Sequence, residues 1–386
     1  MALGGGALGA LRERITSGSG PFPRVDLVVL ASVVGLLGFG LVAIYSSKLV
    51  ALTAQGIAPT YFVTRQLVAA GVGVVVMLVA FAIDYRTLRA FSPLFYLGAL
   101  VLLVVVLTPL GLEIRGSSRW IPLLGYRLQP SELMKVALLL LLALVLHEAE
   151  DEPSGPRTAA ALGLVLVPVA LVFVQPDLGT AIVYVWLAGT MFLVGGVRVR
   201  YLVGLATAGL VASVVALQTQ LIRDYQVRRL TSFLDVADPG AEAAGALFQT
   251  RQSLIAIGSG RLSGRGLFAG TQTALSYVPD NHTDFVFTVI GEELGFVGAA
   301  TVLALFALLG WRALRIAAEA KDRDGRLIAA GIAAMLVLQV FVNVGMTIGI
   351  MPVTGLPLPF VSYGGTSLVV WLGLVGLLLN VHLRRF

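Results

Sequence analysis

Ionisable side chains interrupt or border the long apolar stretches of this sequence, and they are the groups that could do chemistry. They are Glu132, Lys135, Asp177, His282, Asp284, Glu292 and Glu293. Within a membrane, burying such a group costs a few kcal/mol unless it is paired, so each is a functional candidate by default. A carboxylate held there can accept a proton from a hydroxyl group. Intramembrane charges also serve transport, so the residue types alone leave both kinds of protein open.

Four of these acids have local structural interpretations that can coexist with function. Glu132 and Asp177 each stand just after a Gln-Pro pair at the start of an apolar stretch. Proline suits the first helical position, and an acid in the first turn favours the helix dipole. Glu132 and Lys135 are three residues apart, close enough to pair on one helix face. For Glu292 and Glu293 we favour a structural contact to neighbouring backbone or to cavity water.

Two polar loops offer cations and amides to a phosphate-bearing substrate. The stretch 115–120 supplies two guanidinium groups beside a tryptophan, a residue that is also common at membrane interfaces. The glycine-rich stretch 258–266 combines exposed amides with Arg261 and Arg265. It could cradle a pyrophosphate, and a flexible hinge is an equal alternative. Upstream, residues 242–257 alternate apolar and polar side chains, as in a helix that lies on the membrane surface.

The segment 352–367 cannot form a regular helix, although it is too apolar for a free loop. It contains three prolines and three glycines, and a helix through the prolines would lose hydrogen bonds and clash. Irregular backbone at membrane depth is tolerated only where it is buried in protein or lines a cavity. We therefore expect residues 352–363 to be non-helical, to pack against the spans, and to line an apolar groove that holds lipid tails near Asp284.

The composition requires that these residues sit in a membrane bundle. Of the 386 residues, 58% are hydrophobic and 12% are charged, whereas soluble domains have about 45–50% and about 25%. A soluble enzyme and a disordered chain are therefore excluded. Because cysteine is absent, a disulfide scaffold and a thiolate nucleophile are excluded too, and three scattered histidines disfavour a His-rich metal site.

Ten apolar stretches approach the length of about 20 residues that a spanning helix needs. They are 27–46, 67–83, 91–111, 132–147, 158–174, 179–197, 201–219, 285–308, 327–350 and 366–383. We predict an all-α polytopic membrane protein, a bundle of ten transmembrane helices with a long extracytoplasmic loop, 220–283, between helices 7 and 8. Residues 1–24 form a flexible cytoplasmic tail, and residues 25–386 form one transmembrane domain. Lys and Arg concentrate in loops on the same side as both termini, which places both termini in the cytoplasm.

Five motifs taken together resemble the SEDS family (shape, elongation, division and sporulation). They are Gln175–Ala181, Ala256–Gly260, His282–Phe285, Glu292–Gly295 and Leu358–Gly365. The likeness runs from residue 26 to residue 384. The motifs are highly specific when taken together, whereas any one alone would not be. Residues 352–360 look more like the elongation branch than the division branch. Arg261 and Arg265 stand where the family often has Gly and Lys, and Asp280 stands where Glu is frequent.

The resemblance implies a peptidoglycan glycosyltransferase that polymerises lipid II on the outer face of the bacterial cytoplasmic membrane during cell elongation and shape maintenance. It implies lipid II, the nascent glycan strand, membrane lipid and a class B penicillin-binding protein (a transpeptidase) as partners, and no nucleic acid. No cofactor is evident, and a divalent cation, Mg or Mn, stays open. The main alternative is a transporter that flips lipid II, whose polar residues should continue into the inner half. The third class of function is a noncatalytic scaffold.

The resemblance also implies roles for single residues. The essential acid of the family maps onto Asp284, and its other important polar positions map onto Glu132, Lys135 and Asp177. We expect Lys135 to lie near Asp284 and to keep its carboxylate ionised. The candidates for substrate and pyrophosphate binding are Arg115, Arg119, Trp120, Ser259, Arg261, Arg265 and His282. The candidates for the lipid groove are Pro357, Pro359, Phe360 and Tyr363.

Overall fold

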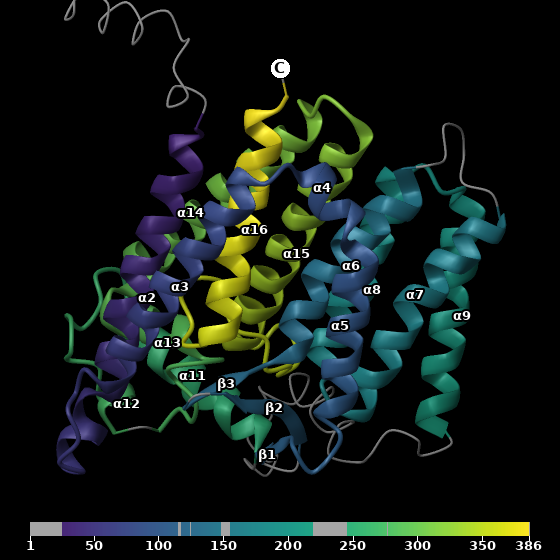
Figure 1. Cartoon of the computed structure of the whole chain (residues 1–386). Coiled ribbons are helices and arrows are strands. Elements are labelled where there is room, and N and C mark those ends of the chain that lie inside the picture. Colours follow the sequence, from purple (N-terminus) through teal and green to yellow (C-terminus); the bar gives the residue numbers. More distant parts are fainter. Residues whose placement is uncertain are drawn as a thin grey trace, which may run out of the picture.

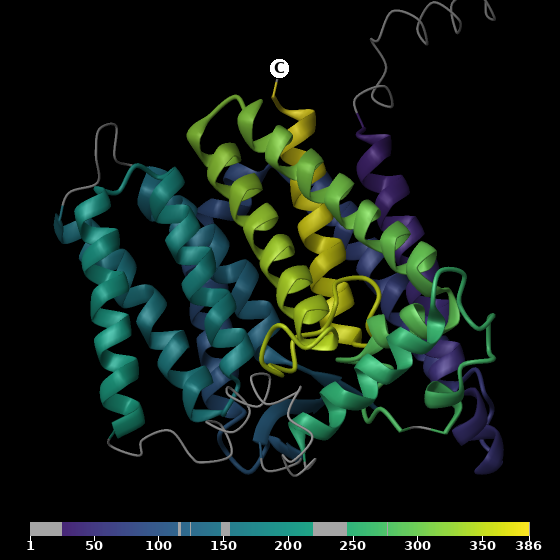
Figure 2. The ribbon, with the colours of Figure 1, turned by 180° about the vertical axis from the view of Figure 1, so that it is seen from behind.

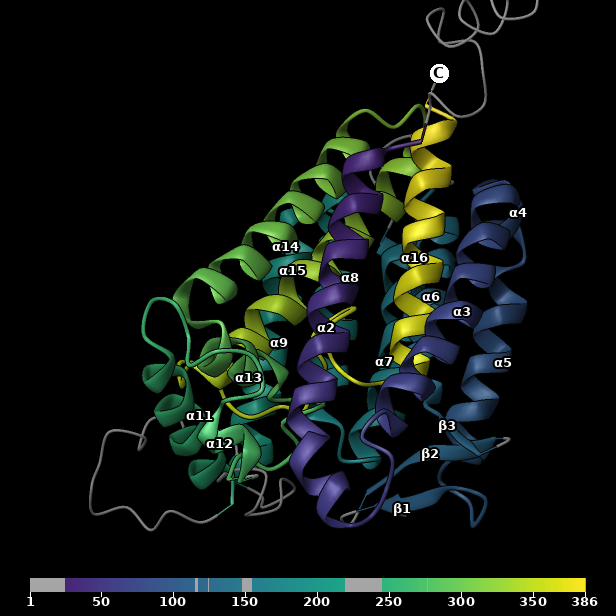
Figure 3. The same ribbon diagram turned by 90° about the vertical axis from the view of Figure 1, so that its left-hand side faces the viewer.

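Long helices run between two ends of the molecule in the computed structural model (Figure 1). The structure describes residues 25–114, 117–123, 125–147, 155–218, 245–275 and 277–385. The predicted tail 1–24 and Arg115 lie outside these residues. We call the end near the C-terminus the terminal end, and the opposite end, which carries the strands, the sheet end (Figures 1 and 3).

The apolar stretches of the sequence fall mainly on helices, although residues 106–111 of the predicted stretch 91–111 lie beyond α5. The helices before the long loop are α2 (Leu27–Ala54), α3 (Tyr61–Ala82), α4 (Tyr85–Ala90), α5 (Ser92–Val105), α6 (Pro130–His147), α7 (Gly155–Val174), α8 (Leu178–Val194) and α9 (Val199–Gln218). The later helices are α11 (Ala246–Gly260), α12 (Thr271–Ala274), α13 (Val286–Glu293), α14 (Gly295–Ala318), α15 (Arg323–Thr347) and α16 (Gly365–Leu383). Among the described residues, seven helices are long and apolar enough to cross a membrane, and α5 and α8 are shorter apolar helices. The prediction of a polytopic, helical membrane protein is confirmed.

Helix α15 lies at the centre of the bundle and links its two ends. It contacts α14, α8, α6 and α16, and Figures 1 and 2 show it running among them. Its side chains Ala329, Ala333 and Asn343 are fully buried. Small residues such as the alanines let neighbouring helices approach closely. Helix α15 is therefore a firm support for residues placed at the sheet end.

The stretch predicted as one span over 285–308 is two helices, α13 and α14. Gly295 has a φ of 64°, a left-handed conformation that glycine adopts without the steric cost of a Cβ. The chain therefore turns here, and the long helix starts at Gly295. The predicted start of this span was wrong, because apolar composition does not reveal a turn between two helices. Glu292 and Glu293 consequently end the short helix α13 and precede the long one.

A small antiparallel sheet at the sheet end was not predicted and is the exception to the all-α assignment. It comprises β1 (Leu112–Ile114), β2 (Ser117–Leu123) and β3 (Tyr126–Leu128), in the order β1–β2–β3. The Thr366 hydroxyl of α16 donates to the carbonyl of Arg127 (2.9 Å) and accepts from the amide of Gln129 (3.2 Å). Arg65 of α3 donates to the carbonyl of Gly125. Polar contacts thus attach the sheet to the helices. Such contacts cannot be predicted from the sequence of short strands of mixed polarity.

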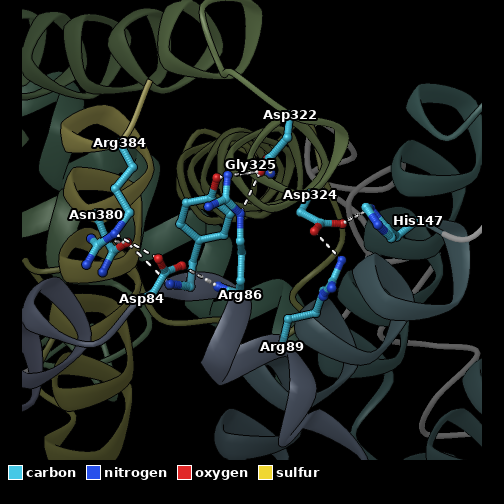
Figure 4. Close-up of polar contacts among 10 residues, drawn as sticks. Asp84, Arg86, Arg89, His147, Asp322, Asp324, Gly325, Asn380 and Arg384 are labelled. Atoms are coloured by element: carbon cyan, nitrogen blue, oxygen red, sulfur yellow. Dashed lines mark hydrogen bonds and ion pairs between the residues drawn. The ribbon is translucent and has the colours of Figure 1, made fainter. Parts of the chain in front are cut away.

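At the terminal end, ion pairs fasten α4 to α15 (Figure 4). Arg86 pairs with Asp322 at 2.6 Å. Arg89 pairs with Asp324, and Nδ1 of His147 at the end of α6 lies 2.6 Å from the other oxygen of that carboxylate. These contacts join the ends of α4, α6 and α15 at the end of the bundle opposite the strands.

We expect acid to weaken this cluster through Asp322. Burial opposes ionisation of Asp322, but hydrogen bonds from the Gly325 amide, from Arg86 and from the Tyr85 hydroxyl outweigh it and hold the pKa of the carboxyl below its usual 3.8. An acid whose pKa is lowered by folding contributes stability that is fully present above the unfolded pKa. That contribution is lost as the pH falls through the folded pKa.

Asp322→Asn keeps an oxygen for the helix cap but removes the charge. The free energy of unfolding near neutral pH should therefore fall by about 0.5–1 kcal/mol, the range for a partly exposed ion pair. Thermal unfolding in detergent, followed from about pH 7 to about pH 3 across the usual carboxylate range, should show wild type and variant converging in acid. Glu319→Gln, which removes an exposed carboxylate of the same end, is the control. A variant that stays below the wild type by a constant margin down to the lowest pH would contradict the prediction.

Candidate active site

The irregular segment 352–363, called the proline segment below, is non-helical and buried, as predicted. It joins α15 to α16 inside the bundle, where it is drawn in yellow in Figure 2. Leu356 and Val361 are at most 1% exposed. The Phe360 ring packs edge-on against Trp371 of α16, with ring centroids 5.8 Å apart. Apolar side chains therefore hold the segment in place from within the core, while its prolines exclude a helix.

Asp284 lies directly against the proline segment. A Cβ placed on Gly355 would be 3.5 Å from Oδ2 of Asp284. Gly355 has a φ of 78°, a left-handed conformation that favours glycine. The side-chain amide of Asn343 donates to the carbonyl of Asp284 at 2.8 Å and to the carbonyl of Leu356 at 2.7 Å. The half-buried aspartate is thus held through its backbone, with its carboxylate beside Gly355.

The turn before the aspartate is also fastened to the proline segment. The Ser362 hydroxyl donates to the carbonyl of Thr283 at 2.6 Å, and the Tyr363 amide donates to the carbonyl of His282 at 2.9 Å. The His282 ring packs with the rings of Phe62 and Tyr363, at centroid distances of 5.1 and 5.7 Å. His282, predicted to bind substrate, therefore stands in an aromatic cluster beside the candidate base.

Glu132 and Lys135 form a buried ion pair in the first two turns of α6. Nζ of Lys135 lies 2.6 Å from Oε1 of Glu132, and each side chain is only 1% exposed. The prediction that they pair at a spacing of three residues is confirmed. The Tyr184 hydroxyl of α8 donates to the carbonyl of Ser131 at 2.7 Å and so ties α8 to this turn. The closeness of Lys135 to Asp284 stays a prediction.

Asp177 starts helix α8 and holds Arg119. Its carboxylate accepts hydrogen bonds from the amide and hydroxyl of Thr180 at 3.3 and 2.9 Å. Asp177 thus caps α8 as the residue before the helix, so the predicted position in the first turn, after a proline at the first helical position, was wrong. Nη1 of Arg119, from β2, lies 3.6 Å from the same carboxylate. Arg119 also donates to the carbonyls of Gln175 (3.3 Å) and Pro176. The arginine predicted to bind pyrophosphate therefore fastens the sheet to the Gln-Pro-Asp turn.

One supporting acid, Asp177, is connected to the candidate base through packed contacts. The turn of α8 that follows Asp177 packs against Leu356, whose carbonyl shares an amide donor with the carbonyl of Asp284. The structure thus brings Asp284 and the turn that follows Asp177 to the same proline segment, although the two acids are far apart in the sequence.

The glycine-rich stretch 258–266 is bound to the end of α13. The amides of Arg265 and Gly266 donate to the carbonyls of Glu292 and Glu293, each at 3.0 Å. These two amides cannot also hold a phosphate, so the predicted backbone cradle was wrong at this point. The cause is a backbone pairing between segments that are distant in the chain. The exposed side chains of the two arginines in the stretch remain substrate candidates.

Glu292 and Glu293 brace the loop around α12. Glu292 accepts hydrogen bonds from the amide of Gln272 (2.8 Å) and from the amide and hydroxyl of Thr273 (2.9 and 2.7 Å). Glu293 accepts from the hydroxyl of Ser46 in α2. The favoured interpretation, a structural contact to neighbouring backbone, is confirmed for Glu292. The contact of Glu293 is also structural, but it is made to a side-chain hydroxyl.

The remaining predicted substrate residues make local contacts. The Ser259 hydroxyl donates to the carbonyl of Ala256 at 2.7 Å, and the Arg265 guanidinium donates to the Thr271 hydroxyl at 2.9 Å. Trp120 is half-buried in β2. In the part of the chain that the structure describes, no three histidine or acidic side chains gather as metal ligands would.

Three uncharged polar residues hold the site and were not predicted: Asn343, Gln66 and Ser362. Gln66 of α3 donates to the carbonyl of Ser362 at 3.1 Å and accepts from the amide of Gly364 at 3.2 Å. A search limited to ionisable groups misses uncharged polar residues. For Asn343 and Gln66 the sequence did carry a signal, an amide side chain in or next to an apolar stretch, because a buried amide also needs hydrogen-bond partners.

The apolar helices of this bundle bury an acid–lysine pair and hold an aspartate against an irregular inner segment. These features define a multi-pass membrane protein with ionisable groups inside its bundle. Residues 27–385 match the family model of the FtsW, RodA and SpoVE cell cycle proteins. The chain belongs to this family, the SEDS family. It is 40% identical over 359 residues to stage V sporulation protein E of Bacillus subtilis, covering 92% of this chain and 96% of the relative. It is 42% identical over 314 residues to peptidoglycan glycosyltransferase MrdB of Escherichia coli K12, covering 81% and 83%.

Two solved structures share the fold. One chain of a peptidoglycan synthase complex that coordinates polymerisation and crosslinking matches with a TM-score of 0.75 at 32% identity, covering 94% of this chain and 98% of that chain. The rod shape determining protein RodA of Thermus thermophilus matches with a TM-score of 0.68 at 32% identity and the same coverage of 94% and 98%. The predicted family and fold class are therefore confirmed.

Proposed function

We propose that this chain is a peptidoglycan glycosyltransferase that polymerises lipid II, with Asp284 as its general base. The observation that carries the proposal is the Asp284 carboxylate, half-buried and placed beside Gly355 by backbone ties to the proline segment. A base must be held in place and must reach its substrate, and this position meets both needs. The name of the MrdB relative supports the activity.

In the proposed reaction, a sugar hydroxyl attacks the anomeric carbon of a second sugar that carries a lipid pyrophosphate. Asp284 takes the hydroxyl proton as the glycosidic bond forms, and the bond between the anomeric carbon and the pyrophosphate oxygen breaks. The exposed guanidinium groups of Arg261 and Arg265 supply positive charge for the departing pyrophosphate.

We assign inversion at the anomeric carbon to this reaction. Retention would need a second carboxylate as a covalent nucleophile. The two other acids that the family resemblance selects are already bound to cations, Glu132 to Lys135 and Asp177 to Arg119. A direct displacement assisted by one base is the simpler scheme for this arrangement.

The lipid tails are proposed to lie along the proline segment. Pro357 and Tyr363 are half-buried, whereas Pro359 and Phe360 are buried. Pro357 and Tyr363 are therefore the predicted groove residues that are proposed to touch a lipid tail. Burial of a polyprenyl chain contributes roughly 25 cal/mol per Å² of apolar area, which favours such a groove next to Asp284.

The proposed setting is the bacterial cytoplasmic membrane, with the sheet end outside and both termini in the cytoplasm. The concentration of Lys and Arg in the loops near the termini supports this orientation. A class B penicillin-binding protein is the proposed partner, supported by the similarity to a synthase chain from a complex that couples polymerisation to crosslinking. Similarity to RodA and MrdB, together with residues 352–360, supports a role in elongation.

Purified protein in liposomes with fluorescent lipid II tests this function. Glycan polymer that enlarges with time supports the proposal. Movement of lipid II between leaflets without polymer would identify a transporter instead, and the absence of both would identify a scaffold. The assay thus separates the three classes that the sequence left open.

A further inference from the structure

Asn343 makes a contact that ties two separate segments of the chain to each other. It lies in α15 and is 0% exposed. Its amide nitrogen donates to two carbonyls from separate parts of the chain, that of Asp284, 59 residues away, and that of Leu356, 13 residues away. An amide nitrogen carries two hydrogens, so both of its donors are used in one bridge.

We propose that Asn343 is a positioning residue that locks the backbone of Asp284 to the proline segment. The inference rests on the proposed function, in which Asp284 is the base. The bridge joins the aspartate to the residue after Gly355, and the aspartate carboxylate lies beside Gly355. The side chain therefore sets the distance between the base and the segment proposed to line the lipid groove.

The position requires a side chain that donates two hydrogen bonds, as an amide nitrogen does. A carboxylate would set negative charge against two carbonyl oxygens, and an apolar side chain would leave two acceptors without their donor in a region where Leu356 is 1% exposed. Because α15 is firmly packed, an amide on this helix keeps the backbone of Asp284 and the proline segment in fixed positions relative to α15. A base displaced by about 1 Å can cost about 100-fold in rate, so a lost bridge should appear in kcat.

The test compares Asn343→Leu with Gln339→Leu. Gln339 lies one turn earlier on α15, is also 0% exposed, and accepts from the indole nitrogen of Trp371 at 3.3 Å. Both variants delete a buried amide from one helix, but only the first deletes the bridge. Asn343→Leu should lower kcat for lipid II polymerisation by about 10- to 100-fold with little change in KM. Gln339→Leu should retain kcat within about twofold, as a change outside the reacting geometry does.

Hydrogen exchange supplies a readout that does not depend on activity. In Asn343→Leu, peptides over 282–285 and over 352–358 should exchange faster together, and in Gln339→Leu they should not. Equal losses of kcat in the two variants, or unchanged exchange in both peptides of Asn343→Leu, would overturn the proposal. Polymer made by Asp284→Asn would instead overturn the proposed function, and the exchange result would still report on the bridge.

A second variant keeps the test decisive where Asn343→Leu does not fold. Ser362→Ala removes the neighbouring tie with the loss of a single oxygen. The lost hydroxyl donates to the carbonyl of Thr283 and accepts from the amide of Leu358. It should lower kcat by several-fold and speed exchange in the same two peptides. Wild-type kcat with wild-type exchange in Ser362→Ala would count against the locking of these two segments.

Discussion

The Asp284→Asn protein should remain folded and make no measurable glycan polymer. Asparagine has the same shape, and the carbonyl of residue 284 keeps its hydrogen bond from Asn343. The amide cannot accept the proton of the attacking hydroxyl, so the general-base contribution of about 100- to 10,000-fold is lost. Polymerisation of labelled lipid II by the purified variant, with its melting temperature alongside, measures both parts of this expectation.

A matched control for this variant is Asp280→Asn, four residues earlier in the same turn. Residue 280 has a φ of 56°, which asparagine tolerates nearly as well as aspartate. The control removes one negative charge from the same turn without touching the proposed base. Near-normal glycan synthesis by Asp284→Asn would refute the assignment, and equal losses in both variants would show that only the charge of the turn matters.

The Lys135→Met protein should lose both stability and activity. The lysine and Glu132 are each 1% exposed, and their contact is 2.6 Å. Methionine matches the length of the side chain but leaves a buried carboxylate without its cation, which costs about 3–5 kcal/mol in comparable cases. Thermal unfolding in detergent measures the loss. Arg315→Met, which breaks an exposed pair with Glu319, should cost less than about 1 kcal/mol.

The double variant Glu132→Gln with Lys135→Met separates packing from function. Removing both charges abolishes the uncompensated carboxylate, so most of the lost stability should return, because neutral replacements of a buried pair are often tolerated. Polymerisation should stay absent, since the proposed role of the pair in the site requires its charges. Full activity in the stable double variant would show that the pair has only a structural role. A Lys135→Met protein as stable as the wild type would contradict the stability prediction.

Much of this protein could be predicted from local physics. A run of about 20 apolar residues can satisfy its backbone in lipid only as a helix, and the greater part of each predicted span is helical. A spacing of three residues placed Glu132 and Lys135 on one helix face. Three prolines excluded a helix over the proline segment, and its apolar composition required burial. Each of these outcomes depends on residues that are neighbours in the sequence.

Contacts between segments distant in the chain were decided only by the tertiary structure. The bridge from Asn343, the attachment of Arg119 to the turn before α8, and the pairing of the 258–266 amides with the end of α13 are examples. None has a local signature, because an amide or a guanidinium suits many partners and the packing of the helices selects among them. The family resemblance of the sequence motifs singled out Asp284 as the acid to test. Its place beside Gly355 depends on the tertiary structure, because the Asn343 bridge forms only where α15 packs against the proline segment.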